Sequence, residues 1–157
     1  MSDCCRVGGS AVEAPDRCPD CGRVGRKLDR ITLKALLRPE ALARLSALEH
    51  GFCPSASCRV VYFGLGEVFR CEDVLVPVFQ KEPPGGRTVC YCFAVSEGDI
   101  RREFEATSGS TVVERVTRLV ESDRCACEVR NPQGTCCLGN LTAAVKAALA
   151  ETSATTV

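Results

Sequence analysis

Two pairs of closely spaced cysteines in the first half of the sequence could bind a metal ion. They are Cys18-Pro19-Asp20-Cys21 and Cys53-Pro54-Ser55-Ala56-Ser57-Cys58. A Cys-x2-Cys pair in a tight turn can direct two sulfurs at one ion, and a second pair completes a tetrahedral set of four thiolates. Zinc fits this set best, because it is tetrahedral and binds thiolate. We predict structural zinc bound by Cys18, Cys21, Cys53 and Cys58; the alternative is four free thiols packed as small hydrophobic residues.

Most of the remaining cysteines lie in the second half of the sequence. Cys90 and Cys92 precede two predicted helices, and Cys125, Cys127 and the adjacent pair Cys136-Cys137 follow them. This order can bring four thiolates onto one iron–sulfur cluster at the end of a helical hairpin. Four thiolates can also hold a second zinc, so both kinds of site stay open at this point.

Composition and charge exclude several classes of protein. The chain has 157 residues and 13 cysteines, and 20 basic residues balance 20 acidic ones. Zero net charge gives no electrostatic signal for nucleic-acid binding, and no apolar run reaches the roughly 18 residues that span a membrane. The N-terminus lacks the basic and then apolar segments of a secretory signal. We expect a cytoplasmic protein whose thiols stay reduced, without nucleic-acid binding or membrane insertion.

The first half contains signals for both helix and strand. Pro39 suits the first position of a helix, and Leu42, Leu45 and Leu48 recur at helical spacing before Gly51 ends the pattern. We expect His50 to cap the end of this helix, with metal ligation as the alternative. Residues 59–63 and 67–70 predict two strands of a hairpin joined by the turn 64–66.

The second half is predominantly helical in its pattern. Ser96 and Asp99 form a capping box for a helix over about 97–107, with Ile100 and Phe104 as its apolar contacts. Thr111 with Glu114 predicts a second capping box for a helix that ends near residue 122. An alanine-rich helix is expected over about 140–151.

The cysteine motifs of the second half resemble those of a known family. The order Cys-x-Cys, helix, glycine turn, helix and Cys…Cys resembles the bacterioferritin-associated ferredoxin-like [2Fe–2S] domain. Cys90-Tyr91-Cys92 and the segment 127–137 together are similar to the N-terminal domain of CopZ-type copper chaperones. The first half agrees with that family through its two cysteine pairs and Val60-Val61-Tyr62-Phe63, so the resemblance runs from about Cys18 to Leu149.

The resemblance implies one zinc ion and one [2Fe–2S] cluster as cofactors. Its cluster ligands correspond to Cys90, Cys92, Cys127 and Cys137. The family places the third ligand just before a Val-x-Asn-Pro-x-Gly stretch, which favours Cys127 over Cys125. Adjacent side chains diverge, and we favour Cys137 over Cys136. We also expect backbone amides of residues 131–135 to donate to the cluster sulfurs.

These patterns predict an α+β fold. A small N-terminal zinc-binding half with a β-hairpin and a helix precedes an α-helical [2Fe–2S] half. The predicted organisation is a flexible N-terminus with a Cys-Cys pair, a zinc-binding domain, a linker, a [2Fe–2S]-binding helical domain and a tail. These segments span 1–14, 15–79, 80–88, 89–150 and 151–157.

The family resemblance implies electron transfer and copper handling, with reduction of Cu(II) to Cu(I). The few residues after Leu149 leave no room for the fused copper-carrying domain of the family. Copper or another soft metal ion would therefore pass to a metal transporter or to a separate copper chaperone, while the electron donor is unknown. Any enzymatic role would be limited to electron transfer or metal reduction.

Two further alternatives follow from the sequence. Cys4 and Cys5 form a vicinal pair that could capture a soft ion such as Cu(I), although an unstructured end with inactive thiols is also consistent with their position. The whole chain could instead be a binding module that metals only stabilise, and that docks on a metal transporter or regulator without a redox role. Cys71 is expected to be a buried packing residue.

Overall fold

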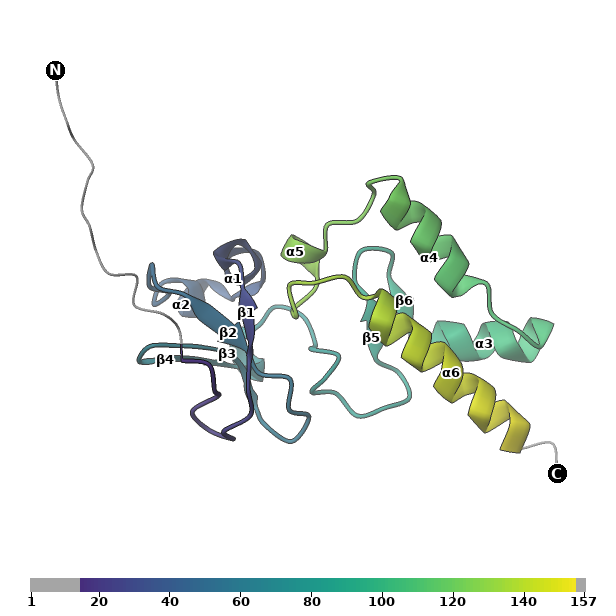
Figure 1. Ribbon diagram of the computed structural model, residues 1–157, viewed down its shortest axis with the longest axis horizontal. Helices are drawn as coiled ribbons and strands as arrows, with labels where there is room; N and C mark the ends of the chain where they lie inside the picture. The colour runs from purple at the N-terminus through teal and green to yellow at the C-terminus, as the bar shows by residue number, and fades with distance from the viewer. Residues whose placement is uncertain (1–14, 155–157) are drawn as a thin grey trace, which may run out of the picture.

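The computed structural model describes residues 15–154, which form two halves lying side by side along the long axis (Figure 1). The predicted Cys4-Cys5 pair lies outside the described residues. The elements of the first half are β1 (Arg26–Leu28), α1 (Arg30–Leu36), α2 (Pro39–Leu42), β2 (His50–Phe52), β3 (Val60–Gly64) and β4 (Glu67–Arg70). Those of the second half are β5 (Thr88–Cys90), β6 (Val95–Ser96), α3 (Glu97–Thr107), α4 (Val112–Glu121), α5 (Cys127–Arg130) and α6 (Leu138–Ala154).

The first half is built on an antiparallel sheet in the order β1-β2-β3-β4. Its β3 strand is buried along its whole length, because Tyr62 packs into the core beneath α1 while Val60 and Phe63 pack beside the paired cysteines. A β-branched and aromatic strand is well suited to a position buried on both faces. The predicted hairpin is confirmed as β3 and β4, with Gly66 at a positive φ of 75° in the turn.

The helix predicted from Pro39 to Gly51 is wrong beyond its first turn. Pro39 does begin α2, but the helix ends at Leu42, whose side chain is largely exposed. Residues 50–52 instead form β2, which pairs with β1 on one side and β3 on the other. Backbone hydrogen bonds to two neighbouring strands outweigh the weak helical preference of three spaced leucines.

His50 is a core residue of β2 and does not cap a helix. Its side chain is fully buried, and Nε2 lies 2.6 Å from Oε2 of Glu67 on β4. Glu67 also accepts hydrogen bonds from the backbone N–H and the hydroxyl of Ser46, at 2.9 and 3.0 Å. Glu67 on β4 therefore links His50 of β2 to Ser46 in the segment that precedes it.

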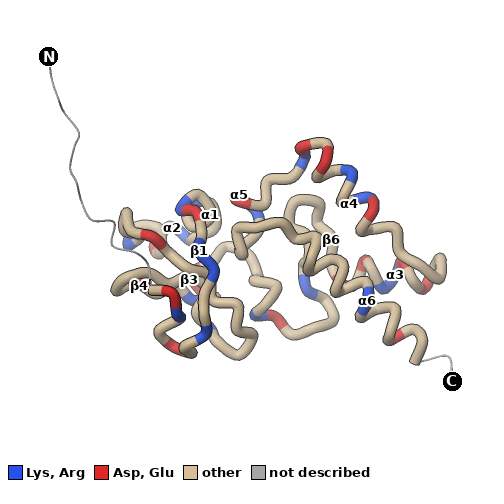
Figure 2. The backbone as a smooth tube through the Cα atoms, in the orientation of Figure 1, with Lys and Arg blue, Asp and Glu red and all other residues tan. Residues whose placement is uncertain are grey.

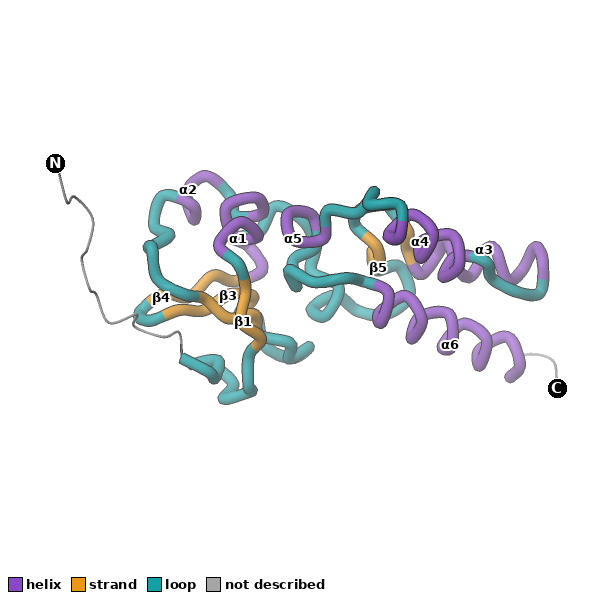
Figure 3. The backbone as a smooth tube through the Cα atoms, turned by 45° about the horizontal axis from the view of Figure 1, so that its top comes forward, coloured by secondary structure: helices purple, strands orange, loops and turns teal. Residues whose placement is uncertain are grey.

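The second half contains a small two-stranded ribbon that the sequence patterns do not predict. Strands β5 and β6 pair antiparallel before the three long helices. Helix α6 packs against both α3 and α4 (Figure 3). The core between them is apolar and includes Val89, Ile100, Phe104, Val116 and Leu141. The half is therefore mainly but not purely helical.

The helix ends in this half follow local signals unevenly. Helix α3 has the predicted bounds, and its capping box is present. The second predicted capping box is wrong, because Thr111 makes no cap hydrogen bond and its hydroxyl donates to Glu103 at 2.8 Å. Helix α6 extends beyond the predicted range at both ends.

Replacing Ser96 with alanine is expected to destabilise the second half by about 1 kcal/mol. The Ser96 hydroxyl accepts from the Asp99 N–H at 3.1 Å, while the Asp99 carboxylate accepts from the Ser96 N–H at 2.8 Å. The change removes the first bond and leaves a helical N–H without its partner. Urea unfolding followed by far-UV circular dichroism measures the loss. Ser122→Ala is the control, since that hydroxyl bonds only back to its own helix at the Arg118 carbonyl; an equal loss in both variants would contradict the capping role.

The two halves have separate cores. Val78 belongs to the core of the first half, and Phe79 packs against the core of the second half. Helix α5, although it follows the second half's helices in sequence, packs against α1 of the first half (Figures 1 and 3). Basic and acidic residues are interspersed over both halves (Figure 2). Within residues 15–154, no helix is long and apolar enough to cross a membrane.

Candidate metal centres

The first cysteine pair lies in a tight turn that leads into β1. The Gly22 N–H bonds to the Cys18 carbonyl at 2.8 Å, and the Cys18 N–H bonds to the Arg23 carbonyl at 2.9 Å. Gly22 has a φ of 69°, a left-handed conformation that glycine adopts without steric cost. The turn therefore closes within five residues and brings Cys18 and Cys21 to the same side.

The second pair lies in the connection between β2 and β3. The Cys53 N–H bonds to the Val61 carbonyl at 2.9 Å, so the connection begins with a strand contact. The Cys58 N–H bonds to the Ser55 carbonyl at 3.3 Å, which folds the intervening residues into a turn. The sheet thus fixes where both sulfurs of this pair stand.

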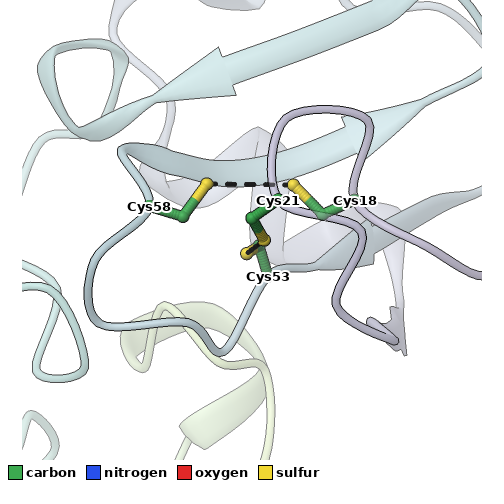
Figure 4. Close-up of side chains that lie close together, drawn as sticks. All are labelled: Cys18, Cys21, Cys53 and Cys58. Carbon is green, nitrogen blue, oxygen red and sulfur yellow. Dashed lines mark hydrogen bonds between the residues drawn. The ribbon is translucent and has the colours of Figure 1, made fainter.

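The four sulfurs of these two turns converge on one point (Figure 4). All four Sγ atoms lie within 4.8 Å of one another, with Cys18 and Cys58 3.9 Å apart and Cys21 and Cys53 3.6 Å apart. Two thiolates bound to one tetrahedral zinc at 2.3 Å lie about 3.8 Å apart. The spacing and the all-sulfur donor set therefore fit zinc, and four protein ligands leave no position for a substrate.

The environment of these thiols differs strongly from one to the next. The pKa of Cys21, which is exposed, is lowered to about 7 chiefly by a hydrogen bond from the Arg23 backbone. Burial raises the pKa of Cys53 to about 12. A buried thiolate needs a nearby cation, so the buried members of the set are suited to holding a metal ion.

Four cysteines of the second half form two close pairs of sulfurs. The Sγ atoms of Cys92 and Cys127 lie 3.7 Å apart. Cys90 and Cys137 share a second contact, in which a hydrogen bond from the Cys137 thiol lowers the pKa of Cys90 to about 6, and the same bond raises the pKa of Cys137. Within residues 15–154, only the first-half cysteines form a group whose ligand atoms all lie within 4.8 Å.

Burial separates the rival cysteines of the second half. Cys127 and Cys137 are buried at 6% and 2% exposure. Cys136 is exposed, and Cys125 is half-buried. Among these four rivals, the two that belong to sulfur pairs are therefore the two that are buried.

Two known proteins or families resemble this chain. Residues 15–75 match the CopZ family described as "Zinc binding domain". The X-ray structure of the Archaeoglobus fulgidus CopZ N-terminal domain is similar at 31% identity and a TM-score of 0.69, over 81% of this chain and 95% of that one. The chain belongs to the CopZ N-terminal domain family. None of the curated proteins matches it.

The first half is thus a zinc-binding domain of CopZ type, in agreement with its four converging sulfurs.

In this CopZ-type chain, Cys71 belongs to neither set of paired cysteines. It is half-buried in a short turn after β4, and its thiol donates to the Arg59 carbonyl at 3.3 Å. The expectation of a packing residue holds only in part, because the thiol is not fully enclosed.

The amides that bond to sulfur are not those expected from the sequence. The Ala126 N–H donates to Cys92 Sγ at 3.3 Å, and the Cys137 N–H bonds to the Cys127 thiol. The Gly134 N–H instead bonds to the Asn131 carbonyl at 2.8 Å, within the turn of residues 131–134. The turn therefore shapes the chain between Cys127 and Cys137 and does not itself contact sulfur through Gly134.

Gly134→Ala is expected to destabilise the CopZ-type fold by about 2 kcal/mol. Gly134 has a φ of 66°, and a Cβ placed there would overlap the side chain of Leu28 and crowd Thr32. Thermal unfolding by circular dichroism measures the effect. Gly85→Ala is the control, since it has a φ of 119° but open space around it. Equal losses in both variants would mean that backbone strain alone, without the clash, explains the result.

Proposed function

We propose that this chain binds one zinc ion and one [2Fe–2S] cluster and acts in one-electron transfer during copper handling. Cys18, Cys21, Cys53 and Cys58 would hold zinc. The cluster would be held by Cys90, Cys92, Cys127 and Cys137. Membership of the CopZ family supports the copper connection.

The observation that carries the proposal is the division of the second set of sulfurs into two pairs. A single zinc needs all four sulfurs around one point, as in the first half. A [2Fe–2S] cluster has two irons and needs two thiolates on each. The contacts Cys92–Cys127 and Cys90–Cys137 would each supply a pair of thiolates to such a cluster.

The chain contributes groups that would tune such a site. When bound, a [2Fe–2S] cluster supplies single-electron chemistry whose potential depends on hydrogen bonds to sulfur and on solvent exposure. The Ala126 N–H donates to Cys92 Sγ, and such bonds stabilise negative charge on sulfur. Cys92 is half-buried, whereas the other three proposed ligands are buried. Its side of the site is the side most open to an electron partner.

Copper is the substrate in this proposal. Cu(II) would take one electron at the second half and leave as Cu(I), and a low-potential electron donor would restore the reduced protein. The exposed thiol of Cys136 is a soft donor of the kind that Cu(I) prefers. The Cu(I) formed would pass in the cytoplasm to a separate copper chaperone or to a metal transporter.

Anaerobic purification followed by metal analysis and absorption spectroscopy tests this function. We expect about one zinc, two irons and two sulfides per chain. Dithionite should bleach the visible bands, and a stoichiometric addition of Cu(II) should restore them while a Cu(I)-specific chelator reports the product. Colourless protein with zinc in both sites would overturn the proposal and favour a metal-stabilised module that docks on a transporter or regulator.

A further inference from the structure

The loop between the third and fourth proposed cluster ligands is held by side chains of the zinc-binding half. We name residues 131–136 the cluster loop. The Tyr62 hydroxyl, on a fully buried side chain in β3, donates to the Pro132 carbonyl at 3.0 Å. Arg26 on β1 donates to the Thr135 hydroxyl at 2.9 Å. Two strands of the first sheet thus hold the loop that leads to Cys137.

Each of these strands begins within five residues of a cysteine turn. Strand β1 follows the turn of Cys18 and Cys21, and β3 starts two residues after Cys58. A metal ion bound to the four sulfurs would link the turn that precedes β1 to the turn that precedes β3. The position of Tyr62 over Pro132 therefore depends on the same short segments that carry the zinc ligands.

Two adjacent residues of the connecting segment reach the two centres separately. The Lys81 ammonium donates at 2.7 Å to the carbonyl of Ser55, which lies in the turn between Cys53 and Cys58. The side chain of Gln80 donates at 2.5 Å to Gln133 in the cluster loop. The side-chain amide of Gln133 in turn donates to the Cys136 carbonyl at 3.1 Å. A single peptide unit thus separates the residue that contacts the turn of Cys53 and Cys58 from the residue that contacts the cluster loop.

Burial makes these contacts energetically significant. Gln133 is only 4% exposed and Asn131 only 3% exposed, so the polar groups that they satisfy have little access to water. Removing one partner of a buried hydrogen bond leaves the other with its full desolvation cost. Through the buried bond from Tyr62 to Pro132, the first half therefore stabilises the observed conformation of the cluster loop.

We propose that Tyr62 and Gln80 are positioning residues for the cluster ligands, and that occupancy of the zinc site controls how firmly the second half retains its cluster. The part that concerns the cluster rests on the proposed function. Energetic coupling between two binding sites is reciprocal, so cluster loading also strengthens zinc binding. The two metal centres then act as one cooperative unit.

Hydrogen–deuterium exchange of the full chain tests the positioning role without any measure of activity. Tyr62→Phe removes a buried hydrogen bond to the loop, and Gln80→Ala removes a partly buried one to Gln133, whose side-chain oxygen keeps a second donor in Asn140. We expect amide exchange in residues 133–136 to rise about fivefold in Tyr62→Phe and about twofold in Gln80→Ala, while exchange in α3 stays unchanged. Val74→Ala is the matched control, because Val74 belongs to the same first-half core but pairs with Leu37. Val74→Ala should leave amide exchange in the cluster loop unchanged relative to amide exchange in α3.

The coupling between the metals is tested by the rate of cluster loss. Cys21→Ser removes the exposed zinc ligand, and we expect it to shorten the half-life of the visible bands in the presence of an iron chelator severalfold. Tyr62→Phe should shorten it in the same direction with zinc still bound. Equal half-lives in wild type and Cys21→Ser would overturn the coupling, and unchanged loop exchange in Tyr62→Phe and Gln80→Ala would overturn the positioning role.

The two failures can be told apart. If the wild-type protein forms no [2Fe–2S] cluster, the proposed function fails, but exchange in the cluster loop still decides whether Tyr62 and Gln80 hold it. If the cluster forms and the loop exchange does not respond to either variant, the proposed function stands and the positioning role is wrong.

Discussion

Cys53→Ser is expected to abolish zinc binding and unfold the first half of the protein. Cys53 is fully buried, and its sulfur lies 3.6 Å from that of Cys21. Structural zinc contributes on the order of 10 kcal/mol to folding in small domains. A half of this size buries too little apolar surface to replace that contribution. Zinc analysis should fall from about one ion per chain to nearly none, and near-UV circular dichroism should lose the signal of the buried Tyr62.

Cys71→Ser is the matched control for this prediction. Cys71 lies in the same half but outside the four converging sulfurs, and a serine hydroxyl can keep its bond to the Arg59 carbonyl. The control should retain zinc and lose less than about 1 kcal/mol of stability. Zinc content that survives Cys53→Ser, or is lost equally in Cys71→Ser, would contradict the assignment of the four ligands.

The cysteine turns could be predicted because their signals are local. A Cys-x2-Cys pair followed by Gly22 specifies its own turn, and Val60 to Phe63 specifies its own strand. Ser96 and Asp99 likewise identify the start of α3, since a capping box involves residues three positions apart. In each case the interacting groups are close enough in sequence for the pattern to contain the whole interaction.

The misassigned segment 43–51 had no such local signal. The strand conformation at its end depends on pairing with β1 and β3 on either side. It also depends on Glu67, which lies 17 positions after His50 and contacts it. The leucine spacing predicts a helix with His50 at its end, but that helix does not form beyond Leu42. A histidine followed by glycine can cap a helix or enter a strand, and only its tertiary partner distinguishes the two.

The contacts between the two halves could not be predicted from the sequence, because they join residues far apart in the chain. Arg26 and Thr135 are 109 positions apart, and Thr32 bonds to the Glu128 carbonyl across 96 positions. Helix α5 has four residues and carries no periodic pattern, so its packing against α1 gives no sequence signal. Gly134 gave a turn signal, but its close approach to Leu28 becomes visible only in three dimensions.

Cys137→Ser is expected to eliminate the visible absorption of the second centre, whereas Cys136→Ser should preserve it. The two residues are adjacent, so the variants differ in little except which sulfur is removed. The Cys137 side chain is buried and contacts Cys90, while that of Cys136 is exposed. Iron and sulfide analysis alongside the absorption spectrum of anaerobically reconstituted protein provides the measurement.

The same comparison applies to the other proposed pair, and the four variants together decide the ligand set. Cys127→Ser should lose iron nearly completely, because its sulfur lies 3.7 Å from that of Cys92, and Cys125→Ser should keep iron. If the cluster is binuclear, loss of either buried sulfur leaves one iron with a single strong protein ligand, so both variants must fail alike. Retention of iron by Cys127→Ser with loss by Cys125→Ser would assign the third ligand to Cys125. A pattern in which zinc replaces iron in every variant would instead identify a second zinc site, and the redox function would fall with it.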